Sequence, residues 1–328
     1  MENIYDIATI FFGSMPKKLI SFVIPAYKEE KNVPLLYKEL ISSFHKIQEK
    51  YDYEIIFVND GSPDDTWQEI QKLCEQDKNV IGINLSRNFG HQAALTAGYS
   101  QAEGDLIISM DGDGQHPPKV AIEMIEKQEK DNLDIVYARV LDREVGWFKK
   151  HSSILYYKFL SLVSDVSIPR NVGDFRLITK QVLKEFLFLS EKDRYIRGMI
   201  GWMGYEYGFV DFMIPSRIHG TSSYTLKKMI KFATDGILNF SMAPLKLGLF
   251  LGIIMVALSL FFFGYVTVDF FVRDVPYPLY KWLVILLFGF VGLLFIFVWI
   301  IGEYIGRIYN EVRQRPLYLI KETRNARK

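Results

Sequence analysis

Short β-branched runs alternate with longer amphipathic segments from Leu19 to about Asp142. The short runs predict strands at Leu19–Pro25, Glu54–Val58, Val80–Leu85, Asp105–Met110 and Asp134–Tyr137. The segments between them predict helices at Asn32–Lys50, Asp64–Asp77, His91–Ala102 and Pro118–Asp131. Strands separated by helices are typical of a mostly parallel sheet with helices on both faces. The predicted fold class is therefore α/β, and ligands of such sheets bind where the carboxyl ends of the strands meet.

Two long apolar segments without charged residues, Leu247–Val268 and Trp282–Ile301, lie near the C-terminus. Each is about the ~20 residues that a helix needs to cross the hydrocarbon core of a bilayer, so we expect two transmembrane helices. Lysine and arginine crowd the outer flanks of this pair, whereas the joining segment has only Arg273 and Lys281. This asymmetry predicts a multi-pass protein of the cell inner (plasma) membrane with both termini and the α/β region in the cytoplasm.

The pattern divides the chain into five regions. They are an N-terminal extension (1–17), a cytoplasmic α/β domain (18–220), amphipathic juxtamembrane helices (221–246), two transmembrane helices (247–305) and a basic cytoplasmic tail (306–328). The extension lacks the basic start of a signal peptide. Two hypotheses stay open: Met15 is the native start, or the extension is an amphipathic appendage. Lysines beside apolar side chains predict that the juxtamembrane helices lie in the lipid headgroup layer.

Composition excludes several classes of site. A formal net charge of +1 gives no overall attraction to nucleic acid, which we do not expect as a partner. Cys74 is the only cysteine, so neither an internal disulfide framework nor a cysteine metal site can form.

The clearest chemical signal is Asp111-Gly112-Asp113-Gly114-Gln115, which follows the apolar run Leu106-Ile107-Ile108. Two carboxylates on a turn kept small by glycine can face a divalent cation and the diphosphate that the cation bridges. Oxygen ligands suit Mg²⁺ or Mn²⁺. A solvated Asp-Gly turn is the alternative, but the position at a strand's carboxyl end favours the metal site.

Two further strand ends carry candidate binding residues. Tyr27 follows the first predicted strand and could cover the face of a base, and Asp60 follows the second and could accept a hydrogen bond from a uracil ring N–H. The alternative for Asn59-Asp60-Gly61-Ser62 is a turn followed by a helix N-cap.

Several ordered motifs resemble the polyprenyl-phosphate glycosyltransferase family. They are Ser21–Glu30 (with Lys28 where Asn is usual), Asn84–His91, Asn171–Leu177, Gly302–Arg307 and Arg315–Tyr318. The family includes dolichyl-phosphate mannose synthase and bacterial bactoprenol glucosyltransferases, and this chain is most similar to the bactoprenol branch with two C-terminal transmembrane helices. The resemblance runs from about Lys18 to Lys321. It implies the type-A glycosyltransferase fold, a Rossmann-like domain with a mostly parallel sheet.

Carried over position by position, the resemblance implies roles for individual residues. Asp111, Asp113 and Gln115 would hold the metal and diphosphate, and Asp113 and Asp174 would be catalytic. The nucleotide pocket would contain Pro25, Tyr27, Glu29, Asp60 and Asp111. The acceptor phosphate would meet Arg139, Lys149 and Ser153, although a plain surface charge pair is the alternative for Lys149 and Lys150.

The function implied is metal-dependent, inverting transfer of a sugar from a UDP-sugar to polyprenyl (undecaprenyl) phosphate at the cytoplasmic membrane face. Glucose is the first expectation for the sugar, with an amino-arabinose derivative, N-acetylglucosamine and mannose open. The second pKa of a phosphate monoester lies near ~6, so the acceptor is mostly dianionic at neutral pH and needs little help from a base. Asp174 is then an orienting group more readily than a proton acceptor. The resemblance also implies a homo-oligomer, a tetramer, in contact with the lipid bilayer.

Three other functions compete with this one. Processive polysaccharide synthases usually have more membrane spans and a Q-x-x-R-W segment, which this chain lacks. A dinucleotide oxidoreductase needs a glycine fingerprint after its first strand, and Pro25-Ala26-Tyr27-Lys28 is not one. The third is a non-catalytic membrane protein that binds nucleotide sugars or recruits a flippase, and only an activity assay distinguishes it from an enzyme. The carboxylates of Asp111, Asp113 and Asp174 argue against this alternative.

Overall fold

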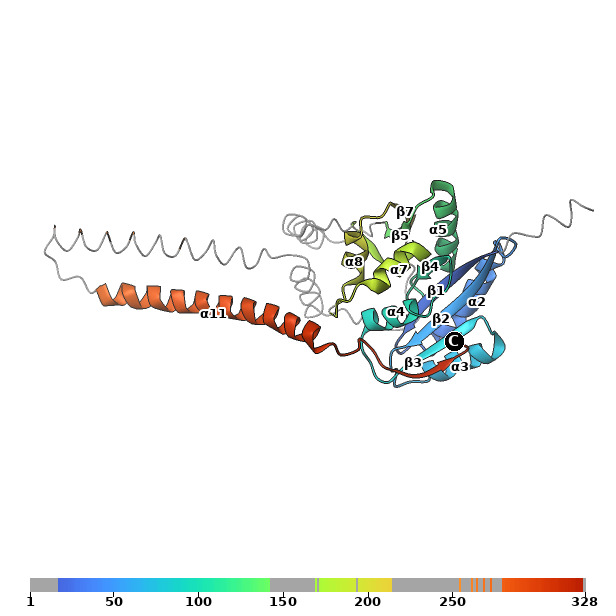
Figure 1. Ribbon diagram of the computed structural model, residues 1–328, viewed down its shortest axis with the longest axis horizontal. Helices are drawn as coiled ribbons and strands as arrows, with labels where there is room; N and C mark the ends of the chain where they lie inside the picture. Colours follow the sequence, from blue (N-terminus) through green and yellow to red (C-terminus); the bar gives the residue numbers. More distant parts are fainter. Residues whose placement is uncertain are drawn as a thin grey trace, which may run out of the picture. The chain divides into compact units, whose positions relative to one another are not determined.

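The structure is a computed structural model and describes residues 17–141, 169, 171–192, 194–213 and 279–326, together with the single positions 254, 261, 264, 268 and 272 (Figure 1). The chain separates into two compact units. One unit contains an eight-stranded sheet and the helices that cover it, and it includes the chain from residue 316 onward. The other contains the long helix α11 (Leu279–Arg313).

The sheet has the strand order β7-β5-β6-β4-β1-β2-β3-β8. Its central strands β4 (Leu106–Ser109), β1 (Lys18–Ala26), β2 (Tyr51–Asn59) and β3 (Val80–Leu85) are parallel. Next to them, β6 (Val172–Thr179) is antiparallel to both β4 and β5 (Ile135–Val140), and β7 (Tyr207–Phe212) is parallel to β5. The last strand, β8 (Ile320–Arg324), is antiparallel to β3. Every strand predicted from the sequence is present, which confirms the α/β class with a mostly parallel centre.

Helices cover both faces of the sheet. The hydrophobic cluster on one face joins the sheet to α2 (Asn32–Phe44), α3 (Thr66–Gln76) and α5 (Pro118–Asp131). The opposite face carries α4 (His91–Tyr99), whose Gly98 lies so close to Val23 of β1 that an added Cβ would be 2.3 Å from the Val23 Cγ1 atom. Tyr99 meets Phe186 of α7 (Lys180–Phe188) edge to face, and α8 (Ile196–Trp202) follows α7 in the chain.

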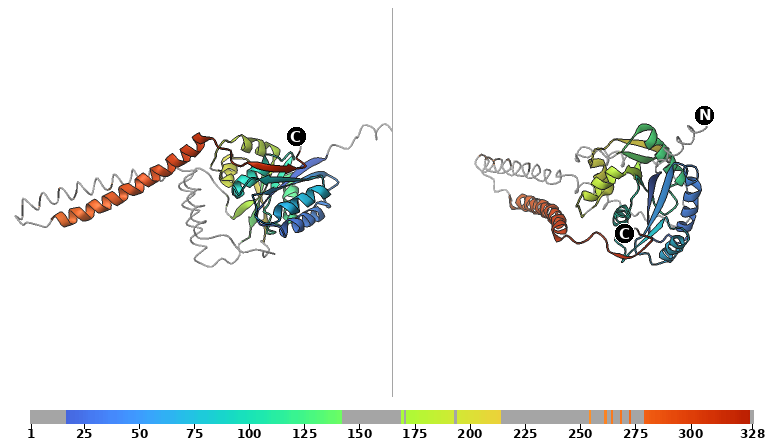
Figure 2. Two further views of the ribbon diagram at one scale, coloured as in Figure 1. Left: turned by 90° about the horizontal axis from the view of Figure 1, so that it is seen from below. Right: turned by 45° about the vertical axis from the view of Figure 1, so that its right-hand side comes forward.

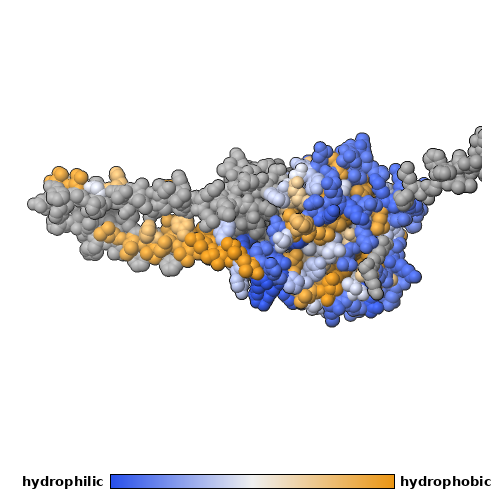
Figure 3. All heavy atoms as spheres, in the orientation of Figure 1, coloured by the Kyte–Doolittle hydropathy of each residue, from blue (hydrophilic) through white to orange (hydrophobic). Residues whose placement is uncertain are grey.

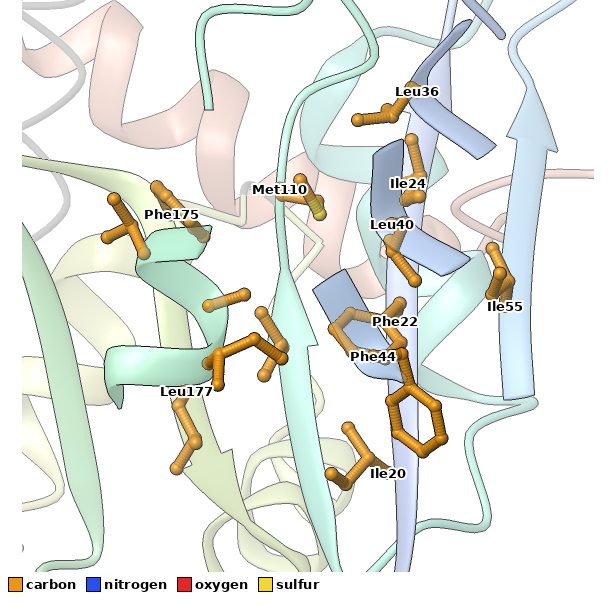
Figure 4. Packing of buried hydrophobic residues seen from close by; sticks show 14 of the residues in the cluster. Ile20, Phe22, Ile24, Leu36, Leu40, Phe44, Ile55, Met110, Phe175 and Leu177 are labelled. Carbon is orange, nitrogen blue, oxygen red and sulfur yellow. The ribbon is translucent and has the colours of Figure 1, made fainter. Parts of the chain in front are cut away.

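Residue periodicity explains the packing of the first face (Figure 4). Ile20, Phe22 and Ile24 alternate along β1 and point to one side of the sheet, as the two-residue period of a strand requires. Leu36, Leu40 and Phe44 recur at the four-residue spacing of one helix face and are buried against them. Burial of each such side chain contributes about 1.5–3 kcal/mol to the stability of the fold.

One predicted helix is shorter than expected. The pattern predicted a helix over Asn32–Lys50, but α2 ends at Phe44. Residues 45–50 form turns in which the N–H of Ile47 donates to the carbonyl of Phe44 and that of Lys50 to the carbonyl of Ile47. These tighter bonds replace the helical pattern because the chain must reverse before β2 begins at Tyr51.

The C-terminal region differs from the expected layout. Residues 306–328 were predicted to be a basic tail, but α11 continues to Arg313 and Ile320–Arg324 forms β8. Of the two predicted spans, Trp282–Ile301 lies within α11, and Leu247–Val268 falls almost entirely outside the described residues. Among the residues that the structure describes, no helix has both the length and the apolar character needed to cross a membrane. The two spans therefore stay a prediction.

Candidate active site

The predicted metal-binding residues lie directly after β4. The N–H of Asp111 donates to Nδ1 of His116 at 2.8 Å, and the carboxylate of Asp113 accepts the N–H of Gln115 at 3.0 Å. Gly114 has a φ of 76°, a left-handed conformation that glycine adopts without strain. The result is a compact turn at the carboxyl end of the parallel strands, where the sequence placed the site.

The Asp111 carboxylate is incompletely satisfied. Its side chain is 37% exposed, yet its Oδ1 atom is buried and has no hydrogen-bond partner within the described residues. The Nε2 atoms of His91 and His116 lie 3.6 Å from Oδ1 and 3.7 Å from Oδ2, beyond hydrogen-bond distance. A buried carboxylate oxygen without a donor is a favourable position for a cation.

The donor set fits a cation that is shared with a substrate. No group of three or more His, Cys, Asp or Glu side chains that could hold a metal ion occurs in the described parts of the chain. Mg²⁺ and Mn²⁺ bound with phosphates commonly use one or two carboxylates and take their other ligands from phosphate oxygens and water. Asp111, Asp113 and Gln115 fit this second kind of site, which is completed only when a diphosphate is present.

A second carboxylate, Asp174, reaches the same region from β6. Arg176 of β6 pairs with Ser109 of β4 in the antiparallel ladder, and the Ser109 hydroxyl donates to the backbone carbonyl of Asp174 at 2.5 Å. This pairing holds Asp174 beside Ser109 at the end of β4, two residues before the start of the Asp111–Gln115 turn. The antiparallel strand β6 therefore brings a distant motif to the predicted site.

Cations surround the Asp174 carboxylate. Arg176 donates through Nη2 to one oxygen of Asp174. The other oxygen lies 3.3 Å from Nε2 of His91 and 3.8 Å from Nη2 of Arg197, and it accepts the side-chain amide of Gln92 at 3.3 Å. Three elements, α4, β6 and α8, thus converge on one carboxyl group that is 15% exposed.

These contacts fix the protonation states. Burial disfavours the charge on Asp174, but Arg197, His91 and Arg176 hold the pKa of this carboxyl well below its usual range. For His91, burial opposes the charge, while the hydrogen bond to Asp174 and the carboxylates of Asp111 and Asp174 raise its pKa to about 9. Asp174 is therefore an ionised group at neutral pH and a poor proton acceptor, and His91 carries a positive charge between the two carboxylates.

Arg176 is the largest fully buried side chain among the described residues, with an exposed fraction of 0%. Its Nη2 atom donates to Asp174 and to the carbonyl of Gly173, whereas Nε and Nη1 have no hydrogen-bond partner within the described residues. The guanidinium also counteracts the rise that burial causes in the pKa of Tyr99 and Tyr137. A buried arginine requires a compensating charge, and Asp174 supplies it.

The Asn59–Ser62 segment connects strand ends. Asp60 is buried, and its two carboxylate oxygens accept the backbone N–H groups of Phe89 at 2.7 Å and Gly90 at 3.0 Å. Burial raises the pKa of Asp60 against the effect of these two bonds. Gly61 has a φ of 60°, and a Cβ there would be 2.3 Å from the backbone carbon of Arg87. The Asn59–Ser62 segment therefore holds the loop after β3 against the end of β2. The nucleotide-binding role of Asp60 stays a prediction.

The remaining predicted nucleotide residues lie at the end of β1. Pro25 pairs with Val58 of β2, and the Tyr27 side chain is 42% exposed, which leaves its ring open to a ligand. The Glu29 carboxylate accepts the side-chain amide of Asn32 at 2.6 Å, and its N–H donates to Thr66 at 2.9 Å. Glu29 thus fixes the start of α2, and a role for it toward nucleotide stays a prediction.

The predicted acceptor residues are not all described. Arg139 forms a two-pronged ion pair with Asp211 of β7, with distances of 2.6 Å and 2.9 Å, and its guanidinium lies 4.6 Å from the ring centre of Phe209. It could receive a phosphate only if this ion pair opened. Lys149 and Ser153 lie outside the described residues.

Sequence reasoning missed four residues of the site: His91, Gln92, Arg176 and His116. His91 and Arg176 stand inside two of the motifs, but no role followed from their positions in the sequence. Two signals were available in the sequence. One is the histidine directly after Gly90, at the start of a predicted helix, and the other is the arginine between the apolar residues Phe175 and Leu177.

Comparison with known proteins identifies the family. The sequence model described as glycosyl transferase family 2 matches residues 21–187. This chain belongs to glycosyl transferase family 2. A glycosyltransferase of Bacillus subtilis named as uncharacterized is 38% identical over 304 residues, which cover 92% of this chain and 93% of the relative. The SfII prophage-derived bactoprenol glucosyl transferase of Shigella flexneri is 34% identical over 305 residues, which cover 93% of this chain and 98% of that relative.

The family 2 assignment makes the protein a glycosyltransferase, and the relatives named bactoprenol glucosyl transferase confirm the resemblance drawn from the motifs. Similar solved structures include mannosyl-3-phosphoglycerate synthase from Rubrobacter xylanophilus, at 15% identity and a TM-score of 0.46, covering 66% of this chain and 71% of that one. Another is glucosyl-3-phosphoglycerate synthase from Mycobacterium tuberculosis in complex with Mn²⁺ and UDP-glucose, at 14% identity and a TM-score of 0.44. The match covers 67% of this chain and 77% of that one.

Proposed function

We propose that this family 2 glycosyltransferase moves a sugar, first of all glucose, from a UDP-sugar to undecaprenyl phosphate, with inversion and with Mg²⁺ or Mn²⁺. The observation that carries the proposal is the pairing of two carboxylate sites at the carboxyl end of the sheet. Asp111 has a buried oxygen that accepts no hydrogen bond from the described residues, and Asp174 is ionised and surrounded by cations. Relatives named bactoprenol glucosyl transferase, matched over nearly their whole length, support the polyprenyl phosphate acceptor and the glucosyl donor.

On the donor side, Asp111, Asp113 and Gln115 would hold the metal ion. A divalent cation supplies Lewis-acid neutralisation of the leaving diphosphate when it is bound. The turn itself contributes preorganisation, because the hydrogen bond from the N–H of Asp111 to His116 and that from the N–H of Gln115 to Asp113 fix it before substrate arrives. Tyr27, exposed at the end of β1, would cover the base.

On the acceptor side, the chain orients an anion without taking its proton. A lipid phosphate with a second pKa near ~6 is mostly dianionic at neutral pH and is already a competent nucleophile. Asp174 is held ionised by Arg176, Arg197 and His91, so it positions its neighbours and does not act as a base. The positive charges of His91 and Arg197 reduce the repulsion between the entering phosphate and the carboxylates.

Attachment to a membrane completes the proposal, because the isoprenoid tail of the acceptor stays in the bilayer and only its phosphate must reach the site. Large apolar side chains are exposed along α11, among them Leu287, Phe290 and Leu294 (Figure 3). Contact with lipid would remove this surface from water. We propose the catalytic domain and both termini on the cytoplasmic side of the cell inner membrane, and a homo-tetramer as the assembly.

The test is direct transfer. Purified protein would be incubated with undecaprenyl phosphate, Mg²⁺ or Mn²⁺ and a panel of UDP- and GDP-sugars, and glycolipid products would be measured by mass spectrometry. A metal-dependent product from UDP-glucose, formed far more slowly by the matched Asp111→Asn variant, is the expected result. A product from a different sugar alone would reject glucose. No product from any donor with folded protein would favour a nucleotide-sugar-binding protein without transfer activity.

A further inference from the structure

The C-terminal strand β8 closes one edge of the sheet. It pairs antiparallel with β3, from Gly82 with Arg324 to Leu85 with Ile320 (Figures 1 and 2). Without it, β3 would be an edge strand with a row of unpaired backbone groups. The chain reaches this position directly after α11, so the strand is the last element to be added to a sheet built by residues far earlier in the sequence.

Asn325 locks the far end of β8. Its side-chain amide donates to the carbonyls of Cys74 at 2.7 Å and Val80 at 2.9 Å, with Asp77 at 3.5 Å. Asn325 has a φ of 52°, a left-handed conformation that asparagine tolerates better than most residues. One side chain thus ties the end of β8 to the α3–β3 connection.

The lead-in of β8 contacts both ends of the segment that carries His91. The carbonyl of Leu319 accepts the N–H of Ser86, the first residue after β3, at 2.8 Å. The hydroxyl of Tyr318 lies 3.0 Å from the hydroxyl of Ser100, the residue that ends α4. Between Ser86 and Ser100 lie the two N–H groups that bind Asp60 and the His91 and Gln92 side chains that meet Asp174.

We propose that β8 is a positioning element of the active site: with Tyr318 and Leu319 it holds the segment 86–100, so that His91 and Gln92 meet Asp174. The consequence for catalysis rests on the proposed transfer function, whereas the restraint on the segment does not. The role differs from general stabilisation because the contacts of β8 lie at the two ends of one segment, and that segment supplies two of the four groups around Asp174.

The experiment replaces Asn325 in the full-length protein. Asn325→Asp places a carboxylate against three carbonyl oxygens, and Asn325→Gly removes the amide while keeping a residue suited to the left-handed φ. Lys321→Ala, an exposed position on the same strand, is the matched control. Amide hydrogen exchange followed by mass spectrometry and steady-state transfer kinetics would be measured on all variants.

Both Asn325 variants should speed exchange of the amides in 86–100 about tenfold, and leave β5 and β6 unchanged, while kcat falls about tenfold and the KM for the donor changes less. Lys321→Ala should match the wild type in both. Unchanged exchange in 86–100, faster exchange spread evenly over the sheet, or unchanged kcat despite faster local exchange would each overturn the proposal. If the wild type transfers no sugar, the proposed function fails, and the exchange comparison still decides whether β8 restrains the segment.

Discussion

Two carboxylates at the same end of the sheet, Asp174 and Asp111, have opposite surroundings. Asp174 is nearly buried and meets Arg176, Arg197 and His91, so its negative charge is neutralised by the protein itself. Asp111 is more exposed, and one of its oxygens is buried without a hydrogen-bond donor in the described residues. Among the described residues, His91 is the only side chain that lies within ion-pair distance of both of them.

These different surroundings give two residues of the same type different roles, one in stabilising the fold and one in binding a ligand. The charge of Asp174 is required by the fold, because a fully buried arginine depends on it. The charge of Asp111 is compensated only in part, by His91 at 3.6 Å, and the side chain is 37% exposed, so it is available to a ligand. The same Asp→Asn replacement should therefore damage stability at one position and activity at the other.

The largest effect is expected for Asp174→Asn. Loss of the carboxylate leaves Arg176 buried without a compensating charge, which should lower the free energy of unfolding by about 3–5 kcal/mol. Urea denaturation of the purified protein measures it. The double variant Asp174→Asn/Arg176→Met should recover much of the loss, since it removes both charges. A single variant as stable as the wild type would contradict the structural role of this pair.

Asp111→Asn should reduce transfer about 10²–10³-fold, equivalent to about 3–4 kcal/mol of transition-state stabilisation, because one negative charge toward the cation is lost. Its free energy of unfolding should stay within about 0.5 kcal/mol of the wild type. Activity is measured as glycolipid formed over a range of Mn²⁺ concentrations. Full activity at low Mn²⁺ would remove Asp111 from the metal site.

Gly98→Ala tests the placement of α4, which carries the histidine that bridges the two carboxylates. The added Cβ would lie 2.3 Å from Val23 Cγ1 and 3.1 Å from Val58 Cγ2, so the helix or the strands must shift. We expect a loss of about 1–3 kcal/mol in stability, with a reduced kcat. Thermal unfolding and transfer assays measure both, and Ala97→Gly on the same helix is a control that adds no volume. Wild-type kcat in Gly98→Ala would show that the position of α4 does not limit the reaction.

The smallest effect concerns the pH dependence of stability without added metal. Because the pKa of His91 is raised to about 9 in the folded protein, its stabilising charge is complete below the unfolded pKa of about 6.5 and is lost as pH rises through about 9. The ring is 40% exposed, so the loss should be only about 1 kcal/mol. His91→Gln should flatten the stability profile between these pH values. An equal loss in the variant would assign the change to another group.

Much of the catalytic unit could be predicted from the sequence. The strand and helix periods located every parallel strand of the centre, and the strand ends located Asp60 and the Asp111–Gln115 turn. These features are local, because a period of side-chain burial and a turn rich in glycine are written in neighbouring residues. The helix after Asn32 ended early for a nonlocal reason, since the chain had to return to the sheet at Tyr51.

The arrangement around Asp174 could not be predicted in the same way. His91, Arg176 and Arg197 lie on three different elements, and only the pairing of β6 with β4 and the packing of α4 and α8 bring them to one carboxylate. Likewise, the sequence after α11 is typical of a charged tail and did not predict β8, because a short polar strand at a sheet edge has no clear hydrophobic alternation of its own. The local pattern of residues determined the helices, the strands and the candidate turn. Long-range strand pairing decided which carboxylate is neutralised and which is left for a cation. It also decided that β8 joins the sheet. The physical reason is that charge compensation and edge pairing depend on distances in space, which the order of residues along the chain does not contain.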